Sequence, residues 1–393
     1  MVGNFGLIRT PRILFGAGQV ENLPKLLRLC GTQVLIITGC KSHQENKALD
    51  KLLSALSVEN LTLHFDRIEK EPTPEDINRI VGRFRLLELN AVVAIGGGSV
   101  MDAGKAVSAM LPFETGVEDY LEGVGTKSHP GIKKYFVAIP TTSGTGSETT
   151  ANAVISGKMN GKGFKRSLRH ENIVPDIAIV DPELTLGCPP EITASSGMDA
   201  FTQLLESYLS VKSGRLTDAL ALEGIGQVHQ CLRRAYSAGD DITARAGMAY
   251  AAMLSGITLA NAGLGLIHGF ASSVGGFTEI PHGIICGSLM GVVNRFMIEK
   301  LLQTKAIGVT ADKYVRLGQL LSETQHKENH WYLRYVADYI DALTEDLHIS
   351  RLQINTTDPS LLGEIAAETD HKNNPVKFEK DQLLEMLKER ITD

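Results

Sequence analysis

The sequence predicts an α/β domain followed by an all-helical domain. Four short apolar runs, rich in β-branched residues, alternate with amphipathic stretches in the first part of the chain. Such runs are typical of strands buried on both faces of a parallel sheet. After Asp181 helix-forming residues dominate, with apolar residues three and four positions apart. We therefore expect a doubly wound parallel sheet within residues 1–183 and an all-helical domain at residues 184–393.

Each predicted strand ends at a residue that breaks or redirects a strand: glycine, proline or aspartate. The four strands are QVLIIT at 33–38, AVVAI at 91–95, YFVAI at 135–139 and IAIV at 177–180. Two helices are also predicted, over residues 19–29 and 73–89. The second helix begins with Thr73 as a candidate N-cap, followed by proline and acidic residues in the first turn.

Composition excludes several classes of protein. A chain of 393 residues is too long for one ordinary core, and a net charge of -6 offers no field that would attract nucleic acid or an anionic membrane. Its five cysteines follow no CxxC spacing, which favours a reducing compartment. Apolar runs of about 20 residues and a secretory-type N-terminus are both absent from the sequence, so we expect a cytoplasmic protein with no membrane partner.

A glycine-rich segment, IGGGSVMDAGKAV at 95–107, joins a predicted strand to a predicted helix. Consecutive glycines let the backbone approach a ligand closely, and the N–H groups at a helix start attract an anion. Ser99 adds a hydroxyl donor. The segment departs from the GxGxxG pattern, so a tight strand-to-helix turn without a ligand is the alternative interpretation.

A second loop, PTTSGTGSETT at 140–150, leaves the next predicted strand. It combines hydroxyl side chains with glycines that keep the backbone open. Two such loops at the carboxyl ends of neighbouring parallel strands form the kind of crevice in which doubly wound sheets bind nucleotides. Together the two segments predict a nucleotide site.

Several blocks of sequence, in order and at a consistent spacing, resemble those of the iron-containing (group III) alcohol dehydrogenases. The blocks are GGGSVMDAGKA at 96–106, PTTSGTGSE at 140–148, PDIAIVDPELTLGCPP at 175–190, SGMDAFTQLLESY at 196–208, GLGLIHGFA and GGFTEIPHG within 263–283, and NNP at 373–375. The resemblance implies a Rossmann-like first domain, a helical second domain and thus the dehydroquinate synthase-like fold. It also implies hydride transfer between a nicotinamide and a small alcohol or aldehyde, by a homodimer.

The resemblance assigns cofactor-binding roles to matching positions. It implies that Asp102 lies beside the nicotinamide half and that Lys165 contacts the ribose, although a solvated surface lysine is an equal alternative for Lys165. The residues expected to hold the pyrophosphate are Gly97, Gly98 and Ser99, and those expected to line the rest of the cofactor are Thr141, Thr142, Thr145 and Ser147.

The resemblance also implies a metal site, with one departure. Asp199, His268 and His282 occupy the positions of an aspartate and two histidines, but Gln203 stands where the family has a third histidine. A carboxylate and two imidazoles suit one Fe²⁺ or Zn²⁺ ion. Three interpretations are open: three strong ligands with an open position, Gln203 as a weak fourth ligand through its amide oxygen, or loss of the metal.

Two further positions bear on mechanism and on cofactor choice. Ser272 stands where the family often has a histidine that relays protons, and a serine can pass a proton to water but cannot act as a base near neutral pH. The first predicted strand ends at Gly39, where a carboxylate would favour NAD(H), and Lys41 follows with Ser42 and His43. These residues favour NADP(H), with a plain turn as the alternative.

Three rival functions remain. One is a metal-independent reductase of the maleylacetate reductase type, which would turn over after thorough chelation. Another is a lyase like dehydroquinate synthase, although the motifs of the helical part resemble the alcohol dehydrogenases instead. The third is a nucleotide-binding protein with a degenerate metal site, which Gln203 and Ser272 motivate.

Overall fold

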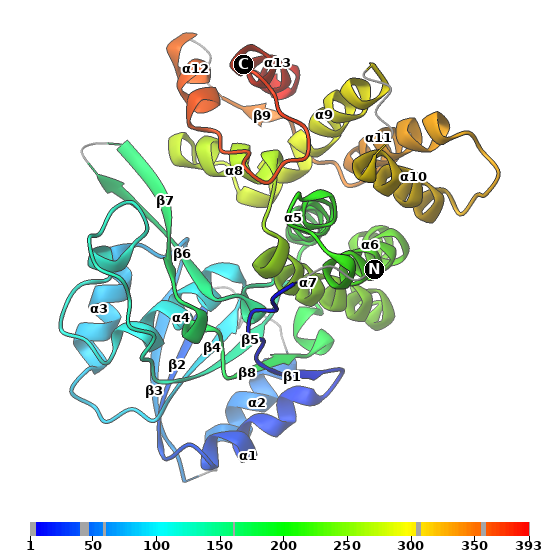
Figure 1. The fold of residues 1–393 in the computed structure, drawn as a ribbon. Coiled ribbons are helices and arrows are strands. Elements are labelled where there is room, and N and C mark those ends of the chain that lie inside the picture. Colours follow the sequence, from blue (N-terminus) through cyan, green and yellow to red (C-terminus); the bar gives the residue numbers. More distant parts are fainter. Residues whose placement is uncertain are drawn as a thin grey trace. The chain divides into compact units, whose positions relative to one another are not determined.

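The computed structural model describes residues 5–39, 47–57, 60–159, 162–303, 308–354 and 359–392. The chain forms two compact units (Figure 1). The first unit comprises Leu7–Pro189 and Gly239–Ile257, and the second comprises Met1–Gly6, Pro190–Ala238 and Thr258–Asp393. The domain boundary at 183–184 stays a prediction; the compact units divide the chain at residues 189 and 190, and residues 239–257 join the first unit.

A six-stranded sheet forms the centre of the first unit within its described residues (Figure 1). Every neighbouring pair in this sheet is parallel, and the strand order is β1-β8-β5-β4-β2-β3. The strands are β1 (Arg12–Phe15), β2 (Gln33–Gly39), β3 (Thr62–Ile68), β4 (Ala91–Gly96), β5 (Tyr135–Pro140) and β8 (Ile177–Val180). The four predicted strands are therefore confirmed, and they form the interior of the sheet.

Helices cover both faces of this sheet, which confirms the doubly wound architecture. On β2, Ile36 lies in one core with α1 and α2, while its neighbour Leu35 lies in a second core with α3 and α4. The helices are α1 (Leu23–Arg28), which follows η1 (Gln19–Asn22), α2 (Lys47–Ser57), α3 (Pro74–Phe84) and α4 (Gly98–Met110). Successive residues of a strand point to opposite faces, so each buried strand supplies both cores.

The start of α3 follows the predicted cap. The Thr73 hydroxyl accepts from the backbone N–H of Asp76 at 3.2 Å, and the Asp76 carboxylate accepts from the backbone N–H of Thr73 at 3.2 Å. This reciprocal capping box satisfies two backbone donors that the helix leaves unpaired. The helix ends at Phe84, earlier than the predicted residue 89.

The sequence did not predict β1, β3 or a separate antiparallel hairpin of β6 (Asn152–Met159) and β7 (Lys162–Arg169). Both β1 and β3 are edge strands of the sheet, and both are partly exposed. Edge strands need no continuous apolar run, so the pattern that identifies interior strands does not reveal them. Short 3-10 turns complete the first unit: η2 (Val117–Tyr120), η3 (Ser147–Thr149), η4 (Glu171–Ile173) and η5 (Pro182–Thr185).

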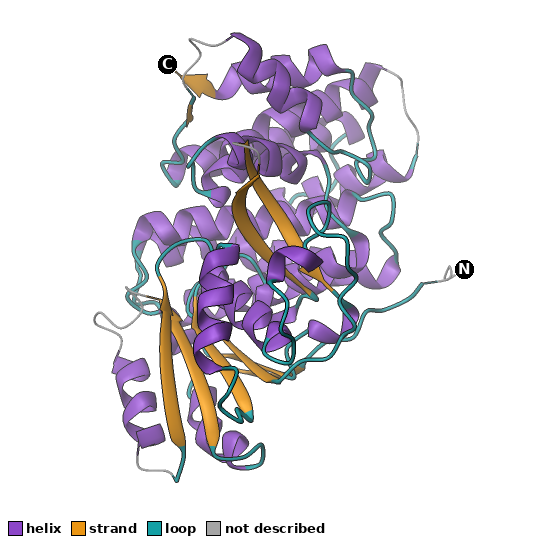
Figure 2. Cartoon of the chain, turned by 90° about the vertical axis from the view of Figure 1, so that its left-hand side faces the viewer, coloured by secondary structure: helices purple, strands orange, loops and turns teal. Residues whose placement is uncertain are grey.

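Helices make up almost all of the second unit (Figure 2). Helix α5 packs closely on α6 because glycines meet leucines there: Gly197 lies against Leu232 and Gly224 against Leu204. The helices are α5 (Pro190–Leu209), α6 (Arg215–Ser237), α8 (Leu266–Phe277), α9 (His282–Gln303), α10 (Val309–Ser322), α11 (Asn329–Asp346), α12 (Pro359–Glu368) and α13 (Lys380–Arg390). Helix α7 spans Ile242–Ala262, and only its last turn belongs to the second unit. The two-residue strands β9 (Leu352–Gln353) and β10 (Ile391–Thr392), which pair in parallel, are the exception to an all-helical prediction.

Among the described helices, none is by itself long and apolar enough to cross a membrane; α7 and α8 meet the length and composition only when they are combined as one bent pair.

Candidate active site

The two loops predicted to bind a nucleotide lie side by side at the carboxyl edge of the sheet. Strands β4 and β5 are neighbours, and Gly96 pairs with Pro140 in their register. A Cβ atom added to Gly98 would lie 2.5 Å from the Cγ2 atom of Thr145, and one on Gly97 would lie 3.4 Å from the Oγ1 atom of Thr142. The glycine segment therefore touches the Ser/Thr loop, and only glycine fits this closely at position 98.

Helix α4 begins at this edge of the sheet, beside the Ser/Thr loop. Gly97 is its N-cap in extended conformation, and it provides no side-chain cap for the first N–H groups of the helix. Ser99 follows in the first turn and is half-buried. An uncapped helix start of this kind is suited to hold a phosphate, both through its N–H groups and through the helix dipole.

The neighbouring strand β2 ends at Gly39, on the same edge as β4, since Thr38 pairs with Ile95. A glycine provides no carboxylate at this point. Lys41, together with Ser42 and His43, lies outside the described residues, so its predicted role in cofactor choice stays a prediction.

A buried lysine holds the Ser/Thr loop in place. The side chain of Lys105 is completely buried, and its Nζ atom donates to the backbone oxygens of Ser147 at 2.8 Å and Asn152 at 2.6 Å. It also contacts the hydroxyls of Ser147 at 3.0 Å and Thr150 at 2.9 Å. A buried ammonium needs such partners to offset its lost hydration. Lys105 thus ties α4 to the loop that follows β5.

Two carboxyl groups accompany this lysine, and burial shifts all three groups toward their neutral forms. Burial raises the pKa of Asp102, although Lys105 and a 2.5 Å hydrogen bond from the Ser147 hydroxyl oppose the shift. Burial raises the pKa of Glu148 to about 7 and lowers that of Lys105 to about 8. Lys165, on β7, forms an ion pair with Glu71 and is mostly buried, so it is not the freely solvated lysine of the alternative interpretation.

Thr141, Thr142 and Thr145 belong to the same loop. Thr141 is buried, while Thr142 and Thr145 are half-buried, and the loop turns at Gly146 with φ of 60°. A Cβ atom at Gly146 would lie 2.5 Å from the backbone nitrogen of Gly256 in α7. The part of α7 that belongs to the first unit therefore supports this loop from behind.

The second unit gathers four potential metal ligands. Asp199 from α5, His268 from α8, and His282 and Cys286 from α9 place one donor atom each within 4.8 Å of one another. The Nε2 atom of His268 lies 3.4 Å from the Oδ1 atom of Asp199, and that of His282 lies 3.7 Å from the same oxygen. The Cys286 sulfur lies 3.9 Å from the Nε2 atom of His268. The three strongest predicted ligands are thus brought together, and a cysteine joins them.

Glu206 orients His268. Its carboxylate accepts from the Nδ1 atom of His268 at 2.7 Å and from the backbone N–H groups of Ile267 at 2.6 Å and His268 at 3.3 Å. This arrangement places one proton of the imidazole on Nδ1 and turns Nε2 toward Asp199 and Cys286. Metal-binding histidines commonly have such a carboxylate behind them.

The charge balance of this cluster suits a cation. Burial disfavours the imidazolium form, but the Cys286 sulfur with Asp199 and Glu206 holds the pKa of His268 well above its ordinary range. Burial raises the pKa of Cys286 to about 11. Two carboxylates around one imidazole therefore retain a proton there, and a metal ion that uses Nε2 must displace it.

Gln203 and Ser272 lie one helical turn beyond predicted ligands. Gln203 follows Asp199 on α5 and is buried, with an exposed fraction of 4%. Ser272 follows His268 on α8, and its side chain is exposed. The roles of Gln203 as a weak ligand and of Ser272 in proton transfer stay predictions.

The donor set fits a divalent transition metal. A carboxylate oxygen, two imidazole nitrogens and a sulfur are the ligands that Zn²⁺ and Fe²⁺ use in proteins. Exposed carboxylates often gather without a metal, but Asp199 is only 3% exposed and His268 only 9% exposed. Buried ionisable groups that converge on one point are typical of a functional site.

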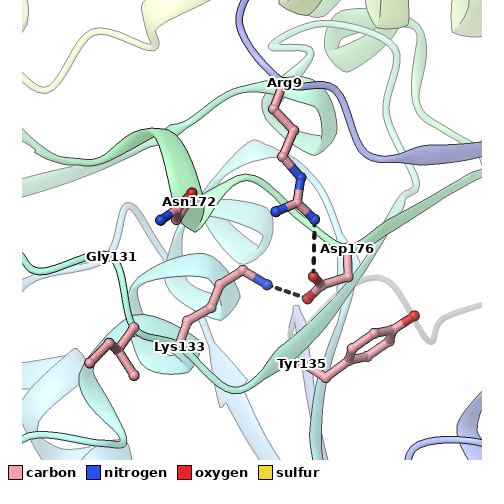
Figure 3. Close-up of a pocket in the computed structure, with 7 residues that line it drawn as sticks. Arg9, Gly131, Lys133, Tyr135, Asn172 and Asp176 are labelled. Carbon is pink, nitrogen blue, oxygen red and sulfur yellow. Dashed lines mark hydrogen bonds and ion pairs between the residues drawn. The ribbon is translucent and has the colours of Figure 1, made fainter.

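A pocket of about 440 Å³ lies elsewhere in the first unit (Figure 3). It adjoins the amino ends of β5 and β8, and Asp176 forms ion pairs there with Lys133 and with Arg9, the latter at 3.5 Å. Burial lowers the pKa of Lys133, while Asp176 opposes the shift. Doubly wound sheets bind nucleotides at the carboxyl ends of their strands, so this pocket is on the wrong edge for the cofactor.

Sequence reasoning missed Cys286, Glu206 and Lys105 as site residues. Cys286 follows His282 by four positions, a spacing that places both on one helix face and was available as a signal. Lys105 lies within the glycine-rich segment, but sequence reasoning assigned it no role. Glu206 gave no signal, because its partner His268 is 62 positions away along the chain.

Comparison with known proteins identifies the family. Residues 10–182 match the family model described as iron-containing alcohol dehydrogenase, and residues 193–391 match its C-terminal counterpart. "Alcohol dehydrogenase 4" of Saccharomyces cerevisiae is 34% identical over 393 residues, covering 98% of this chain and 97% of that protein. "1-propanol dehydrogenase PduQ" of Salmonella typhimurium is 36% identical over 310 residues, covering 78% and 76%.

The fold agrees with these matches. An alcohol dehydrogenase from Oenococcus oeni superposes with a TM-score of 0.88 at 24% identity, covering 98% of this chain and 100% of that one. The chain belongs to the iron-containing alcohol dehydrogenase family. Membership makes it an oxidoreductase of the alcohol dehydrogenase type, and the family implies a metal, a nicotinamide cofactor and small alcohols or aldehydes as substrates.

Proposed function

We propose that this chain is a metal-dependent, NADP(H)-preferring alcohol dehydrogenase that also reduces small aldehydes. The observation that carries the proposal is the convergence of Asp199, His268 and His282 on one buried point of the second unit. The first unit contributes the glycine-rich and Ser/Thr loops at the carboxyl edge of its sheet. A cytoplasmic homodimer remains part of the proposal, as the sequence led us to expect.

The first unit would hold the cofactor through its own backbone and hydroxyls. Gly97, Gly98 and Ser99 would bind the pyrophosphate at the start of α4. Asp102 would lie beside the nicotinamide half, and Lys165 would contact the ribose. Thr141, Thr142, Thr145 and Ser147 would line the remaining length. When bound, the nicotinamide supplies the hydride.

The second unit would hold the metal through Asp199, His268 and His282. When bound, the metal supplies Lewis-acid stabilisation of the oxygen that bears the developing charge. Glu206 keeps the Nε2 atom of His268 turned toward Asp199, since it accepts the proton on Nδ1 at 2.7 Å. Ser272 is exposed and would exchange a proton between water and the product oxygen, because a hydroxyl both donates and accepts.

Metal analysis tests this proposal directly. We would purify the protein anaerobically and measure iron and zinc per chain by elemental mass spectrometry. About one metal ion per chain is expected, with loss of metal and turnover together in His268→Ala. His229→Ala is the matched control, because His229 bonds to Tyr339 at 2.9 Å, outside the cluster. A His268→Ala protein that keeps both metal and turnover contradicts the proposed site.

Cofactor preference has its own test. β2 ends at Gly39, so no side-chain carboxylate at this position repels a 2′-phosphate. Calorimetric titration is expected to give a lower dissociation constant for NADPH than for NADH. Clearly tighter binding of NADH would show that the strand end does not select NADP(H).

A further inference from the structure

We propose that Cys286 is a ligand of the metal and that its thiolate makes the site select Zn²⁺ over Fe²⁺. The inference rests on the proposed metal site and concerns the identity of its fourth donor. In this site the sulfur of Cys286, on α9, takes the place of the weak amide ligand of Gln203.

The backbone of α9 places Cys286 at the cluster. His282 and Cys286 are four residues apart, so both side chains lie on the same face of the helix. Glycines on either side of Cys286 bring α9 close to α5: a Cβ atom on Gly283 would lie 2.2 Å from the backbone oxygen of Ser195, and one on Gly287 would lie 3.1 Å from the Cβ atom of Met198. Helix α9 is therefore pressed against the helix that carries Asp199, next to the face that bears His282 and Cys286.

The sulfur faces the nitrogen that a metal would use. It lies 3.9 Å from the Nε2 atom of His268, and the Nδ1 atom of that ring is already occupied by Glu206. A buried cysteine usually acts as a small apolar side chain. Here the side chain is completely buried but faces a carboxylate and two imidazoles instead of an apolar core.

The spacing of the donors agrees with tetrahedral coordination. With bond lengths of about 2.0–2.1 Å to nitrogen or oxygen and about 2.3 Å to sulfur, a tetrahedral Zn²⁺ separates nitrogen from oxygen by about 3.4 Å and nitrogen from sulfur by about 3.6 Å. The observed separations are 3.4 Å between His268 and Asp199, 3.7 Å between His282 and Asp199, and 3.9 Å between His268 and Cys286. The remaining separations are at most 4.8 Å, so side-chain adjustments of about 1 Å would bring all four donors onto one ion.

The ligand chemistry sets the metal preference. Thiolate is a soft ligand that favours zinc, whereas carboxylate, imidazole and amide donors discriminate less against iron. Zn²⁺ also binds more tightly than Fe²⁺ to sites of mixed nitrogen, oxygen and sulfur ligands. A sulfur in place of a neutral amide therefore shifts this member of an iron-named family toward zinc.

X-ray absorption at the zinc edge tests the ligand itself, apart from activity. We would load the full-length protein with Zn²⁺ and compare it with Cys286→Ser, using Cys286→Ala as a second variant and Cys231→Ser as the matched control. Cys231 is also buried, in α6. The wild type and the control are expected to show one sulfur neighbour at about 2.3 Å, and both Cys286 variants are expected to lack it.

Metal competition gives an independent measurement. Loss of the thiolate is expected to raise the dissociation constant for Zn²⁺ by more than the roughly 10–100-fold typical of losing a residue behind a ligand, while that for Fe²⁺ changes less. Thermal unfolding of each variant without metal establishes that it is folded. Zinc bound with only nitrogen and oxygen neighbours in the wild type overturns the role of Cys286 and leaves the metal site intact. A folded wild type that binds iron but no zinc overturns the zinc preference, and one that binds neither metal overturns the proposed metal site.

Discussion

Replacing Glu206 by glutamine is expected to loosen the proposed metal site while keeping its shape. The carboxylate receives two short hydrogen bonds, from the backbone N–H of Ile267 at 2.6 Å and from the Nδ1 atom of His268 at 2.7 Å. Hydrogen bonds to a charged group contribute roughly 1.5–3 kcal/mol, against roughly 0.5–1.5 kcal/mol for neutral pairs. Glu206→Gln therefore lowers the free energy of unfolding by about 2 kcal/mol, about 1 kcal/mol for each bond that loses its charge.

The same change acts on the metal. Losing the carboxylate behind a histidine ligand typically weakens metal binding by about 10–100-fold, because the imidazole becomes less basic and less firmly oriented. Competition for Zn²⁺ with a chromophoric chelator measures this directly. Glu223→Gln is the control. Glu223 is exposed on α6, and within the described structure its carboxylate accepts one hydrogen bond, from Gln227 at 3.2 Å. An unchanged dissociation constant for Zn²⁺ in folded Glu206→Gln would refute the reasoning.

Three further predictions concern the first unit. Gly98→Ala places a Cβ atom 2.5 Å from Thr145, so NADPH should bind at least about tenfold more weakly by calorimetry, whereas Gly226→Ala, with open space around it, should leave binding unchanged. Glu148 binds its proton more tightly in the folded protein, with a pKa of about 7 against its ordinary 4.5. Its contribution to the free energy of unfolding is therefore complete below pH 4.5 and is lost as the pH rises through 7. Between about pH 5 and about pH 8, the free energy of unfolding of Glu148→Gln, measured in urea, should rise by up to about 3 kcal/mol relative to that of the wild type. The same pH dependence of this free energy in both proteins would contradict the prediction. Lys105→Met leaves several buried acceptors without their donor and should lower the free energy of unfolding by about 3 kcal/mol or more, measured by the same method.

The interior of the sheet was predictable because burial on two faces leaves a direct mark on composition. QVLIIT at 33–38 and AVVAI at 91–95 contain almost no polar residue, since both sides of these strands pack against helices. Edge strands carry no such mark: β3 includes His64, Asp66 and Arg67, and it was not predicted. The β6–β7 hairpin was missed for the same reason, since its second strand, KGFKRSLR, reads as a charged loop.

The two loops proposed to bind the nucleotide could be predicted from the sequence, but the contacts that support them could not. Strand ends followed by glycines and hydroxyls identify the loops, because parallel strands end at a shared edge. The contact between Lys105 and the loop after β5 spans 42 positions and depends on how α4 lies against the sheet. Local patterns do not encode such a contact, since a lysine within an amphipathic helix is normally solvated.

The proposed metal site shows how one donor can be exchanged for another while the remaining donors keep their positions. Asp199 and Gln203 form an i, i+4 pair on α5, and His282 and Cys286 form another on α9. Both helices direct their first member of the pair at the same point, because the donor atoms of Asp199 and His282 lie 3.7 Å apart. A strong donor lost one turn along α5 can therefore be regained one turn along α9 without moving Asp199, His268 or His282. Sequence reasoning recorded the change at Gln203 but overlooked the i, i+4 spacing of His282 and Cys286 on α9.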